Sequence, residues 1–230
     1  MLKGKFISAV IVAAGSSTRM NSAVSKQLMK IGGRAVLQHT VSAFCKSDAV
    51  DEIVIVCPEN DIAAFKELLK GSEIVLPIVF TVGGSTRQQS VRNGVNAVNP
   101  DCDVIAIHDG ARPLVKPDDI VKTVLDALNF GAATLAVPAK DTIKMVENGT
   151  VVSTPPREKL FLIQTPQVFN KHAYIEAFEK AEREGLDLTD DCQLIEAAGG
   201  TVHITLGDYS NIKITTPDDI IIAEALLNKR

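Results

Sequence analysis

The sequence has 230 residues and a formal net charge of −4, from 24 lysines and arginines against 28 aspartates and glutamates. Hydrophobic residues make up 46% of the chain but aromatic residues only 4%, so aliphatic side chains must fill the core, as in an α/β protein. This composition argues against intrinsic disorder, and the mild negative charge argues against general binding to nucleic acid.

Cysteine spacing and hydropathy indicate the compartment. The four cysteines, Cys45, Cys57, Cys102 and Cys192, are widely spaced and form no CxxC pair. We interpret them as reduced residues in or near the core, and not as a zinc site or a disulfide framework. No apolar run approaches the roughly 20 residues that a helix needs to span a bilayer. A strand-like run begins almost at once, which leaves no room for a signal or transit peptide, so we expect a soluble, cytoplasmic protein.

The first predicted element lies in the stretch from Ile7 to Gln27. Residues 7–14 are apolar or small without helical spacing, which predicts a buried strand of a parallel sheet. Gly15, three hydroxyl residues and two cations, Arg19 and Lys26, follow it, and such a loop can bind a nucleotide phosphate. Neither GxxxxGK[ST] nor GxGxxG occurs here, so an ordinary turn with two solvated basic residues stays open as an alternative.

Helices and strands alternate over the next hundred residues. Helical spacing predicts helices over 35–45, 61–69, 85–98 and 117–128. Short apolar runs predict strands over 52–57, 104–107 and 132–137, and Pro77 makes 74–82 an interrupted or edge-like strand. This alternation predicts βαβ units and a mostly parallel sheet with right-handed crossovers.

The pattern changes over residues 138–157. Two strand-like runs flank Glu147, Asn148 and Gly149, and Asn-Gly between such runs is a strong hairpin signal. Pro155 and Pro156 follow in an irregular segment that is hard to bury. We interpret residues 138–157 as an arm that projects from the main sheet and contacts a second subunit, with a floppy surface flap as the alternative.

The rest of the chain returns to an α/β pattern. We expect helices over 170–184, 189–198 and 216–228, with Asn170, Thr189 and Thr216 as their N-caps, and strands over 201–206 and 211–214. No internal repeat, low-complexity tract or linker is visible. The chain is therefore expected to be one domain, residues 1–230, with its arm.

Four polar clusters follow predicted strands. They are Arg19 with Lys26, residues 83–90, residues 108–112, and Asn211 with Lys213. Ligands of open α/β sheets bind beyond the carboxyl ends of the strands, so four clusters at such ends favour one shared site.

Each cluster alone also has a simpler explanation. Asp109 at a strand end suits a Mg²⁺-binding carboxylate, but helix capping or an ion pair with Arg112 explains it equally well. His108 is better explained as a hydrogen-bonded residue than as a metal ligand. Arg87 begins a helix whose N-terminus attracts anions, although the preceding glycines also fit a plain tight turn. Lys213 is a surface residue of an edge strand unless its ammonium group faces an anion.

A resemblance to a known family decides among these possibilities. The motifs AAGSSTRM…SKQ, HDGARP, KDTIK, QTPQVF, TDD and NIKITTPDD, in that order, closely resemble the 2-C-methyl-D-erythritol 4-phosphate cytidylyltransferases of non-mevalonate isoprenoid biosynthesis. AAG…RM alone marks only the wider sugar-nucleotidyltransferase class, whereas the six motifs together are specific. They span about residues 7–227. The resemblance implies an α/β, Rossmann-like three-layer nucleotidyltransferase fold with a mostly parallel sheet and a projecting β-arm.

The resemblance also implies the reaction and the residues of the nucleotide half of the site. CTP and a polyol phosphate would become a CDP-polyol and pyrophosphate, with Mg²⁺ as the cofactor. Cytidine would be held by a set of small residues: Ala13, Ala14, Gly15, Gly84, Ser85 and Ser90. Arg19 and Lys26 would bind the triphosphate and stabilise the transition state, and Asp109 would bind the metal.

For the second substrate, the resemblance implies a homodimer whose arms reach into each other's sites. Thr142 and Arg157 on the arm would bind the substrate phosphate in the partner's site, with Lys213 beside the reacting oxygens. Thr165, Arg112 and residues 189–191 match the rim of the family's active site less decisively.

Two departures from the family pattern and three alternative functions remain. Ser25 stands where the family usually has Pro before the catalytic lysine, and Ser210 stands where an acidic residue is usual, so a second metal carboxylate is in doubt.

Ribitol-5-phosphate cytidylyltransferases share HDxxRP, TPQ and the arm, but tend to carry a Gly-Gly pair in the opening loop. A non-catalytic nucleotide-binding module would have lost at least one of the cations. An NAD-dependent dehydrogenase would need a glycine fingerprint that this chain lacks.

Overall fold

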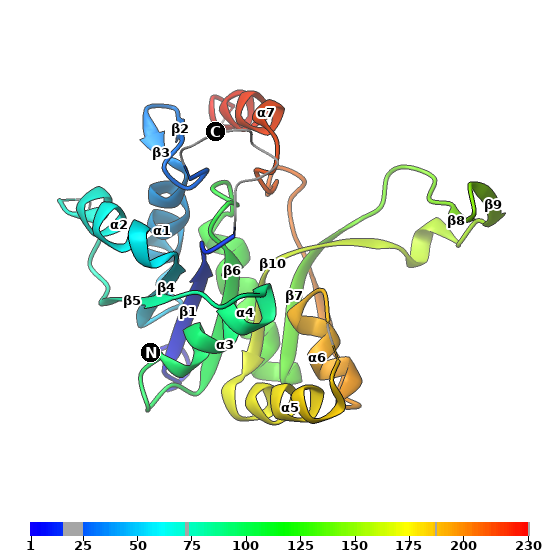
Figure 1. The fold of residues 1–230 in the computed structure, drawn as a ribbon, viewed down its shortest axis with the longest axis horizontal. Coiled ribbons are helices and arrows are strands. Elements are labelled where there is room, and N and C mark those ends of the chain that lie inside the picture. The colour runs from blue at the N-terminus through cyan, green and yellow to red at the C-terminus, as the bar shows by residue number, and fades with distance from the viewer. Residues whose placement is uncertain (16–24, 72–73, 187, 230) are drawn as a thin grey trace.

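The structure is a computed structural model that describes residues 1–15, 25–71, 74–186 and 188–229. The described residues form a seven-stranded sheet in the order β11-β7-β10-β6-β1-β4-β5 (Figure 1). The strands are β1 Ile7–Val12, β4 Glu52–Cys57, β5 Ile78–Val82, β6 Val104–Asp109, β7 Ala132–Pro138, β10 Phe161–Asn170 and β11 His203–Leu206. All pair in parallel except β10, which is antiparallel to both of its neighbours.

Helices cover both faces of the sheet and make three layers. They are α1 Val36–Lys46, α2 Ile62–Leu69, α3 Arg87–Asn96, α4 Pro117–Phe130, α5 Lys171–Glu184, α6 Asp191–Ala197 and α7 Pro217–Leu227. Alternate strand residues point to opposite faces, so Ile7 and Ile11 pack with α1, α2 and α4, whereas Val10 packs with α3, α5 and α6. The predicted three-layer α/β fold with a mostly parallel sheet is confirmed.

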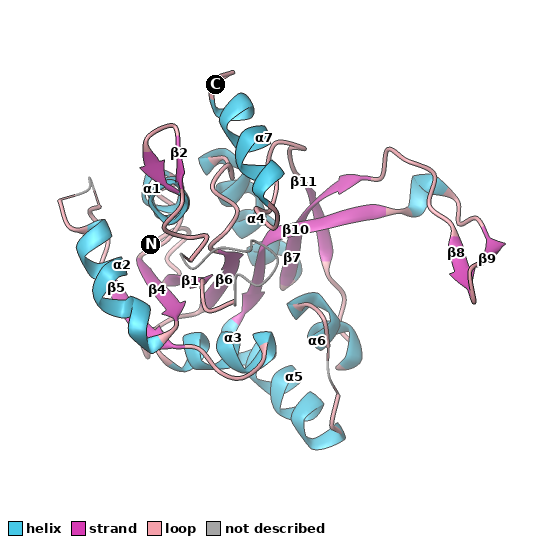
Figure 2. Ribbon diagram, turned by 45° about the horizontal axis from the view of Figure 1, so that its top comes forward, coloured by secondary structure: helices cyan, strands magenta, loops and turns pink. Residues whose placement is uncertain are grey.

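The projection of the arm from the main sheet is also as predicted. Strands β8, Met145–Glu147, and β9, Thr150–Ser153, form an exposed hairpin that extends far from the main sheet in both views (Figures 1 and 2). Asn148 and Gly149 at its turn have φ angles of 48° and 78°, the positive values that a two-residue type I′ turn requires. The chain returns to the sheet through a 3₁₀ turn, Arg157–Lys159.

Three local predictions were wrong or incomplete. Residues 211–214 do not form a strand, and their loop is held to the body by the Ile214 N–H, which donates to the Ala111 carbonyl at 2.8 Å. The N-cap of α6 is Asp190, whose carboxylate accepts from the Gln193 N–H at 3.0 Å, and not Thr189. Strand β10 was not predicted at all, because Pro166 lies inside it.

The C-terminal helix packs against a small hairpin near the site. The hairpin consists of β2, Lys30–Ile31, and β3, Arg34–Ala35, and α7 begins with a capping box between Thr216 and Asp219. Ile31, Ile214 and Ala223 bury their side chains together, which joins α7 to the loop that carries Lys213. Across the described parts of the chain, no helix is both long and apolar enough to cross a membrane.

Candidate active site

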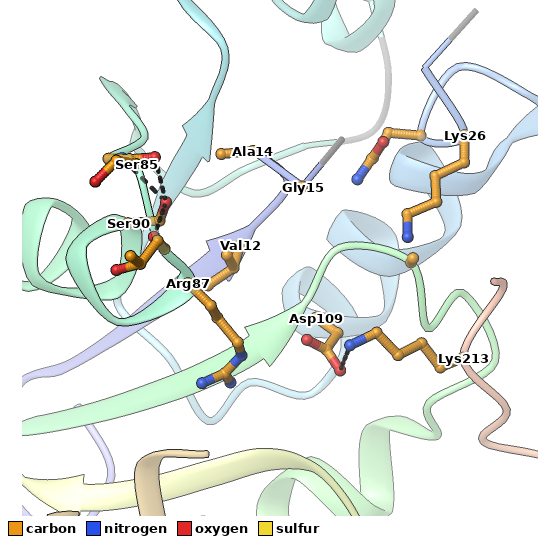
Figure 3. A pocket seen from close by; sticks show the side chains of 13 residues that line it. Val12, Ala14, Gly15, Lys26, Ser85, Arg87, Ser90, Asp109 and Lys213 are labelled. Carbon is orange, nitrogen blue, oxygen red and sulfur yellow. Dashed lines mark hydrogen bonds and ion pairs between the residues drawn. The ribbon is translucent and has the colours of Figure 1, made fainter. Parts of the chain in front are cut away.

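A cavity of about 440 Å³ lies where β1 and β6 end (Figure 3). Loops that follow three strands line it, together with the loop before α7. Residues of all four polar clusters predicted from the sequence contribute to the lining, which consists of Val12, Ala14, Gly15, Lys26, Gln27, Gly84, Ser85, Thr86, Arg87, Ser90, Asp109, Ala111 and Lys213. The expectation that the clusters would meet at one edge of the sheet is therefore confirmed for their described members.

The loop between β5 and α3 forms one wall of this cavity. Its backbone is fixed to α3, because the Gly84 N–H donates to Ser90 Oγ at 3.0 Å and Ser90 Oγ donates to the Thr86 carbonyl at 2.9 Å. A Cβ atom at Gly83 would lie only 2.3 Å from the Cβ of Ala14. The absence of a side chain there lets the two loops approach closely, which suits a narrow slot for a flat base.

Asp109 is the centre of charge in the site. Its Oδ2 is 3.0 Å from Lys213 Nζ and 3.2 Å from Arg112 Nε. Burial alone would raise the pKa of Asp109, but the positive charges of Lys213, Arg112 and Arg87 outweigh burial and hold this pKa well below its usual range. The carboxylate is therefore ionised at neutral pH, and it fixes two cations at the cavity wall.

His108 is linked by hydrogen bonds to Arg112 and Thr165, two residues that contact Asp109. It is fully buried, and its Nε2 lies 3.3 Å from the Arg112 carbonyl, an acceptor, so Nε2 carries the proton. Its Nδ1 then accepts from Thr165 Oγ1 at 3.0 Å, while Thr165 Oγ1 accepts from the Asp109 N–H at 3.0 Å. Burial lowers the pKa of His108 to about 4, so the ring is neutral. The interpretation of His108 as a hydrogen-bonded residue is confirmed.

A second cavity, of about 150 Å³, adjoins the first and shares Arg87, Asp109 and Lys213 with it. Its other lining residues come mostly from β10 and the start of α6: Arg112, Ile163, Gln164, Thr165, Gln167, Thr189 and Asp190. Arg112 and Thr165, predicted to bind substrate, thus lie here. Two adjoining cavities with cations where they meet are suited to two anionic ligands that react with each other.

Some predicted residues lie elsewhere. Ala13 is 1% exposed and lines neither cavity, although its two neighbours in the chain, Val12 and Ala14, both line the larger one. Thr142 and Arg157 are on the projecting arm, away from both cavities, and Arg157 Nη1 donates to the Lys140 carbonyl at 3.1 Å. Arg19 lies outside the described residues.

Sequence reasoning missed part of the lining. Gln27, Gln164 and Gln167 line the cavities, but they were given no role from the sequence beyond their membership of the motifs. Arg87 was noted for its place at a helix start, and its buried ion pair with Asp191, 2.7 Å long, was not foreseen. The position of Arg87 shortly after a predicted strand was the signal that could have placed it at the site.

The site offers limited ligands for a metal ion. Among the described residues, no group of three or more His, Cys, Asp or Glu side chains is placed to hold a metal. Asp109 is the described carboxylate that lines the larger cavity. Mg²⁺ is commonly bound by one or two carboxylates together with substrate phosphates and water, so this donor set fits a magnesium ion that arrives with a triphosphate.

Comparison with known proteins assigns the family. Residues 7–229 match the family of 2-C-methyl-D-erythritol 4-phosphate cytidylyltransferases. The chain belongs to this family. A 2-C-methyl-D-erythritol 4-phosphate cytidylyltransferase from Caldanaerobacter subterraneus subsp. tengcongensis is 44% identical over 97% of this chain and 99% of its own length. One from Desulforamulus reducens is 43% identical over 97% of both chains.

A solved structure agrees with the family assignment. The 4-diphosphocytidyl-2C-methyl-D-erythritol synthase of Anaerococcus prevotii superposes on this chain with a TM-score of 0.88 at 36% identity, covering 98% of this chain and 99% of the other. These members of the cytidylyltransferase family match the chain over nearly its whole described length. The resemblance inferred from six motifs is therefore confirmed.

Proposed function

We propose that this protein transfers the cytidylyl group of CTP to 2-C-methyl-D-erythritol 4-phosphate and releases pyrophosphate, as a step of isoprenoid biosynthesis. The family match over residues 7–229 carries this proposal. The pair of adjoining cavities supports it, since one is large enough for a nucleotide and the other is smaller and cationic. The family match also favours this activity over the ribitol 5-phosphate alternative.

In the proposed reaction, an oxygen of the substrate phosphate attacks the α-phosphorus of CTP. A bond forms between that oxygen and phosphorus, the bond from the α-phosphorus to its bridging oxygen breaks, and pyrophosphate leaves opposite the attacking oxygen. Two anions must be brought together while charge moves to the leaving group. Positioning and fixed positive charge therefore matter more than a strong base.

The residues divide between the two substrates. We propose that Ala14, Gly15, Gly84, Ser85 and Ser90 bind the cytidine, with Ala13 acting through its backbone. Lys26, with Arg19, binds the triphosphate, and Lys213 and Arg112 face the incoming phosphate from the Asp109 side of the site. Thr165 supports the substrate cavity through its bonds to His108 and Asp109.

Asp109 is the proposed ligand for Mg²⁺. Bound there, the ion would draw phosphate oxygens together and neutralise part of their charge. The chain's own contribution is to keep Asp109 ionised and fixed, which the two cations at 3.0 and 3.2 Å accomplish.

Pyrophosphate release tests the activity. Purified protein is incubated with CTP, Mg²⁺ and either 2-C-methyl-D-erythritol 4-phosphate or ribitol 5-phosphate. We expect release with the first polyol phosphate, and release with ribitol 5-phosphate alone would refute the proposal. Lys26→Ala should lower kcat on the order of 10²- to 10³-fold. Lys30→Ala is the matched control, because Lys30 is exposed on β2 and lines neither cavity.

We also propose a homodimer in which the arm of each subunit completes the other's site. The arm exposes a run of apolar side chains that a partner would cover: Ile143, Met145, Val146, Val151 and Val152. Arg157 and Thr142 lie away from the cavities of their own chain, which supports action in trans. The seven-stranded sheet combines strands from β1, which begins at residue 7, to β11, which ends at residue 206, and this supports a single domain. The use of a nucleotide substrate supports a cytoplasmic location.

Subunit mixing tests the exchange of arms. Lys26→Ala and Arg157→Ala homodimers should each be inactive or nearly so. After exchange, a mixed dimer carries one site with both residues intact, so part of the activity should return. Absence of recovery, with subunit exchange confirmed by differently tagged chains, would refute action of Arg157 in trans.

A further inference from the structure

A buried ion pair ties the first residue of α3 to the first residue of α6. Arg87 Nη2 donates to Asp191 Oδ2 at 2.7 Å, across 104 residues of sequence. The Asp191 side chain is 2% exposed, whereas that of Arg87 is 31% exposed. One end of the pair is therefore inside the protein, and the other end reaches a surface that ligands can contact.

Two further hydrogen bonds hold Asp191 in one orientation. Its Oδ1 accepts from the hydroxyl of Tyr174 at 2.8 Å, and its backbone N–H donates to Gln167 Oε1 at 3.1 Å. Tyr174 is fully buried, with its ring 5.3 Å from that of Phe169 and 6.4 Å from that of Phe178. Rotation of the Asp191 carboxylate would break the hydrogen bonds of both its oxygens, and the buried Tyr174 ring cannot move to follow it. Asp191 therefore fixes the direction of the Arg87 guanidinium.

Arg87 lies where the two cavities meet. It lines both of them, together with Asp109 and Lys213, and Figure 3 shows these three side chains projecting from separate segments. Only one of its guanidinium nitrogens, Nη2, has a hydrogen-bond partner among the described residues. The remaining N–H donors can therefore bind an oxyanion without breaking the pair with Asp191.

From this geometry we propose that Arg87 binds the attacking phosphate of the polyol phosphate at the junction of the two cavities. Asp191 and Tyr174 are positioning residues that orient its guanidinium. The phosphate monoester fits the smaller cavity, because Arg87, Arg112 and Lys213 all line it. This inference rests on the proposed function. A tie that only joins α3 to α6 is the competing explanation.

Four variants separate the two explanations. Arg87→Gln removes the charge, Asp191→Asn keeps an oxygen for Arg87 but removes the counter-charge, and Tyr174→Phe removes one hydroxyl while keeping the ring. Arg92→Gln is the matched control, since Arg92 is another α3 arginine that pairs with a helix carboxylate, Glu179 at 3.7 Å, and lines neither cavity. For each variant, kcat, the KM of each substrate and the thermal midpoint are measured.

A binding role predicts selective kinetic losses. Arg87→Gln should lower kcat/KM for 2-C-methyl-D-erythritol 4-phosphate about 10- to 10²-fold, while the KM of CTP stays within about 2-fold. Asp191→Asn should cause about a 10-fold loss in the same parameter, and Tyr174→Phe about a 3-fold loss. In the Arg87→Gln background, Asp191→Asn should add little, because it acts through the guanidinium. Arg92→Gln should keep the kinetic constants of the unmutated protein.

The contrary results are equally definite. Unchanged kinetics in Arg87→Gln, with only a lower thermal midpoint, would show that the pair is a structural tie. A rise in the KM of CTP alone would overturn the assignment to the polyol phosphate. Calorimetric titration of the unmutated protein and Arg87→Gln with 2-C-methyl-D-erythritol 4-phosphate gives a readout that does not depend on turnover. Weaker binding by Arg87→Gln would support the role of Arg87 even if no pyrophosphate were released, which would refute only the proposed function.

Discussion

Acidification should destabilise this protein through His108, well before most carboxylates titrate. The ring is fully buried, 5.0 Å from the Phe44 ring, and both of its nitrogens are bonded in the neutral form. Burial lowers its pKa to about 4, helped by the positive charges of Arg112 and Lys213 and opposed by Asp109. In the unfolded chain the histidine pKa is about 6.5, so between pH 6.5 and 4 the unfolded state binds more protons.

The size of the effect follows from these two pKa values. Stability is lost as the pH falls through this window, by about 2 kcal/mol between pH 7.5 and pH 5 and by about 3 kcal/mol once the pH is below 4. Urea denaturation at pH 7.5, 6 and 5, with EDTA present to exclude bound metal, measures the loss. His108→Gln should be less stable at pH 7.5 but should lack this part of the pH dependence. Equal slopes for both proteins between pH 7.5 and pH 5 would refute the reasoning.

Three further perturbations follow from close contacts and charge. Gly94→Ala would place a Cβ atom 2.4 Å from Val10 Cγ1, so it should lower the free energy of unfolding by about 1–3 kcal/mol, measured by urea denaturation. Gly83→Ala would push against Ala14 at 2.3 Å and should raise the KM of CTP, while an unchanged KM would contradict the close-packed slot. EDTA should stop pyrophosphate release, and Asp109→Asn should raise the Mg²⁺ concentration that restores it; an Asp109→Asn protein with the metal dependence of the unmutated one would exclude Asp109 as the ligand.

Local sequence patterns predicted most helices and strands. They failed where contacts with distant parts of the chain determine whether a segment forms a strand. β10 contains Pro166, which reads as a break, yet the pairing of β10 with β7 shifts register between Ile163 and Gln167 and so passes over the residue that has no N–H to donate. Residues 211–214 have the alternation of a strand but find no neighbouring strand to pair with. Their backbone instead serves the site, because the Asn211 carbonyl accepts from Arg112 Nη1 at 2.8 Å.

The site shows the same division between local and distant signals. Lys26, Gly84 and Asp109 could be predicted because each lies at or after the end of a predicted strand, and the topology of a parallel sheet brings such positions to one edge. The Arg87–Asp191 pair could not, since its members are 104 residues apart and each alone resembles an ordinary charge at a helix start. Only the tertiary fold, which brings the first residue of α6 to the first residue of α3, makes the pair, and no periodicity in either segment specifies that arrangement.

That pairing also explains how an acidic chain can bind two anionic substrates. Arg87 is held by Asp191, and Lys213 and Arg112 are both held by Asp109, so these cations are fixed in place without strong mutual repulsion before any ligand arrives. Burial alone would lower the pKa of Arg87, but the neighbouring carboxylates Asp191 and Asp109 raise it, so the guanidinium stays protonated. A preorganised cation loses little entropy and needs little rearrangement when a phosphate binds, and this advantage does not depend on the net charge of the protein. The negative net charge of the chain is therefore compatible with binding two anionic substrates. The phosphates interact with a few nearby cations, and buried carboxylates fix the positions of those cations.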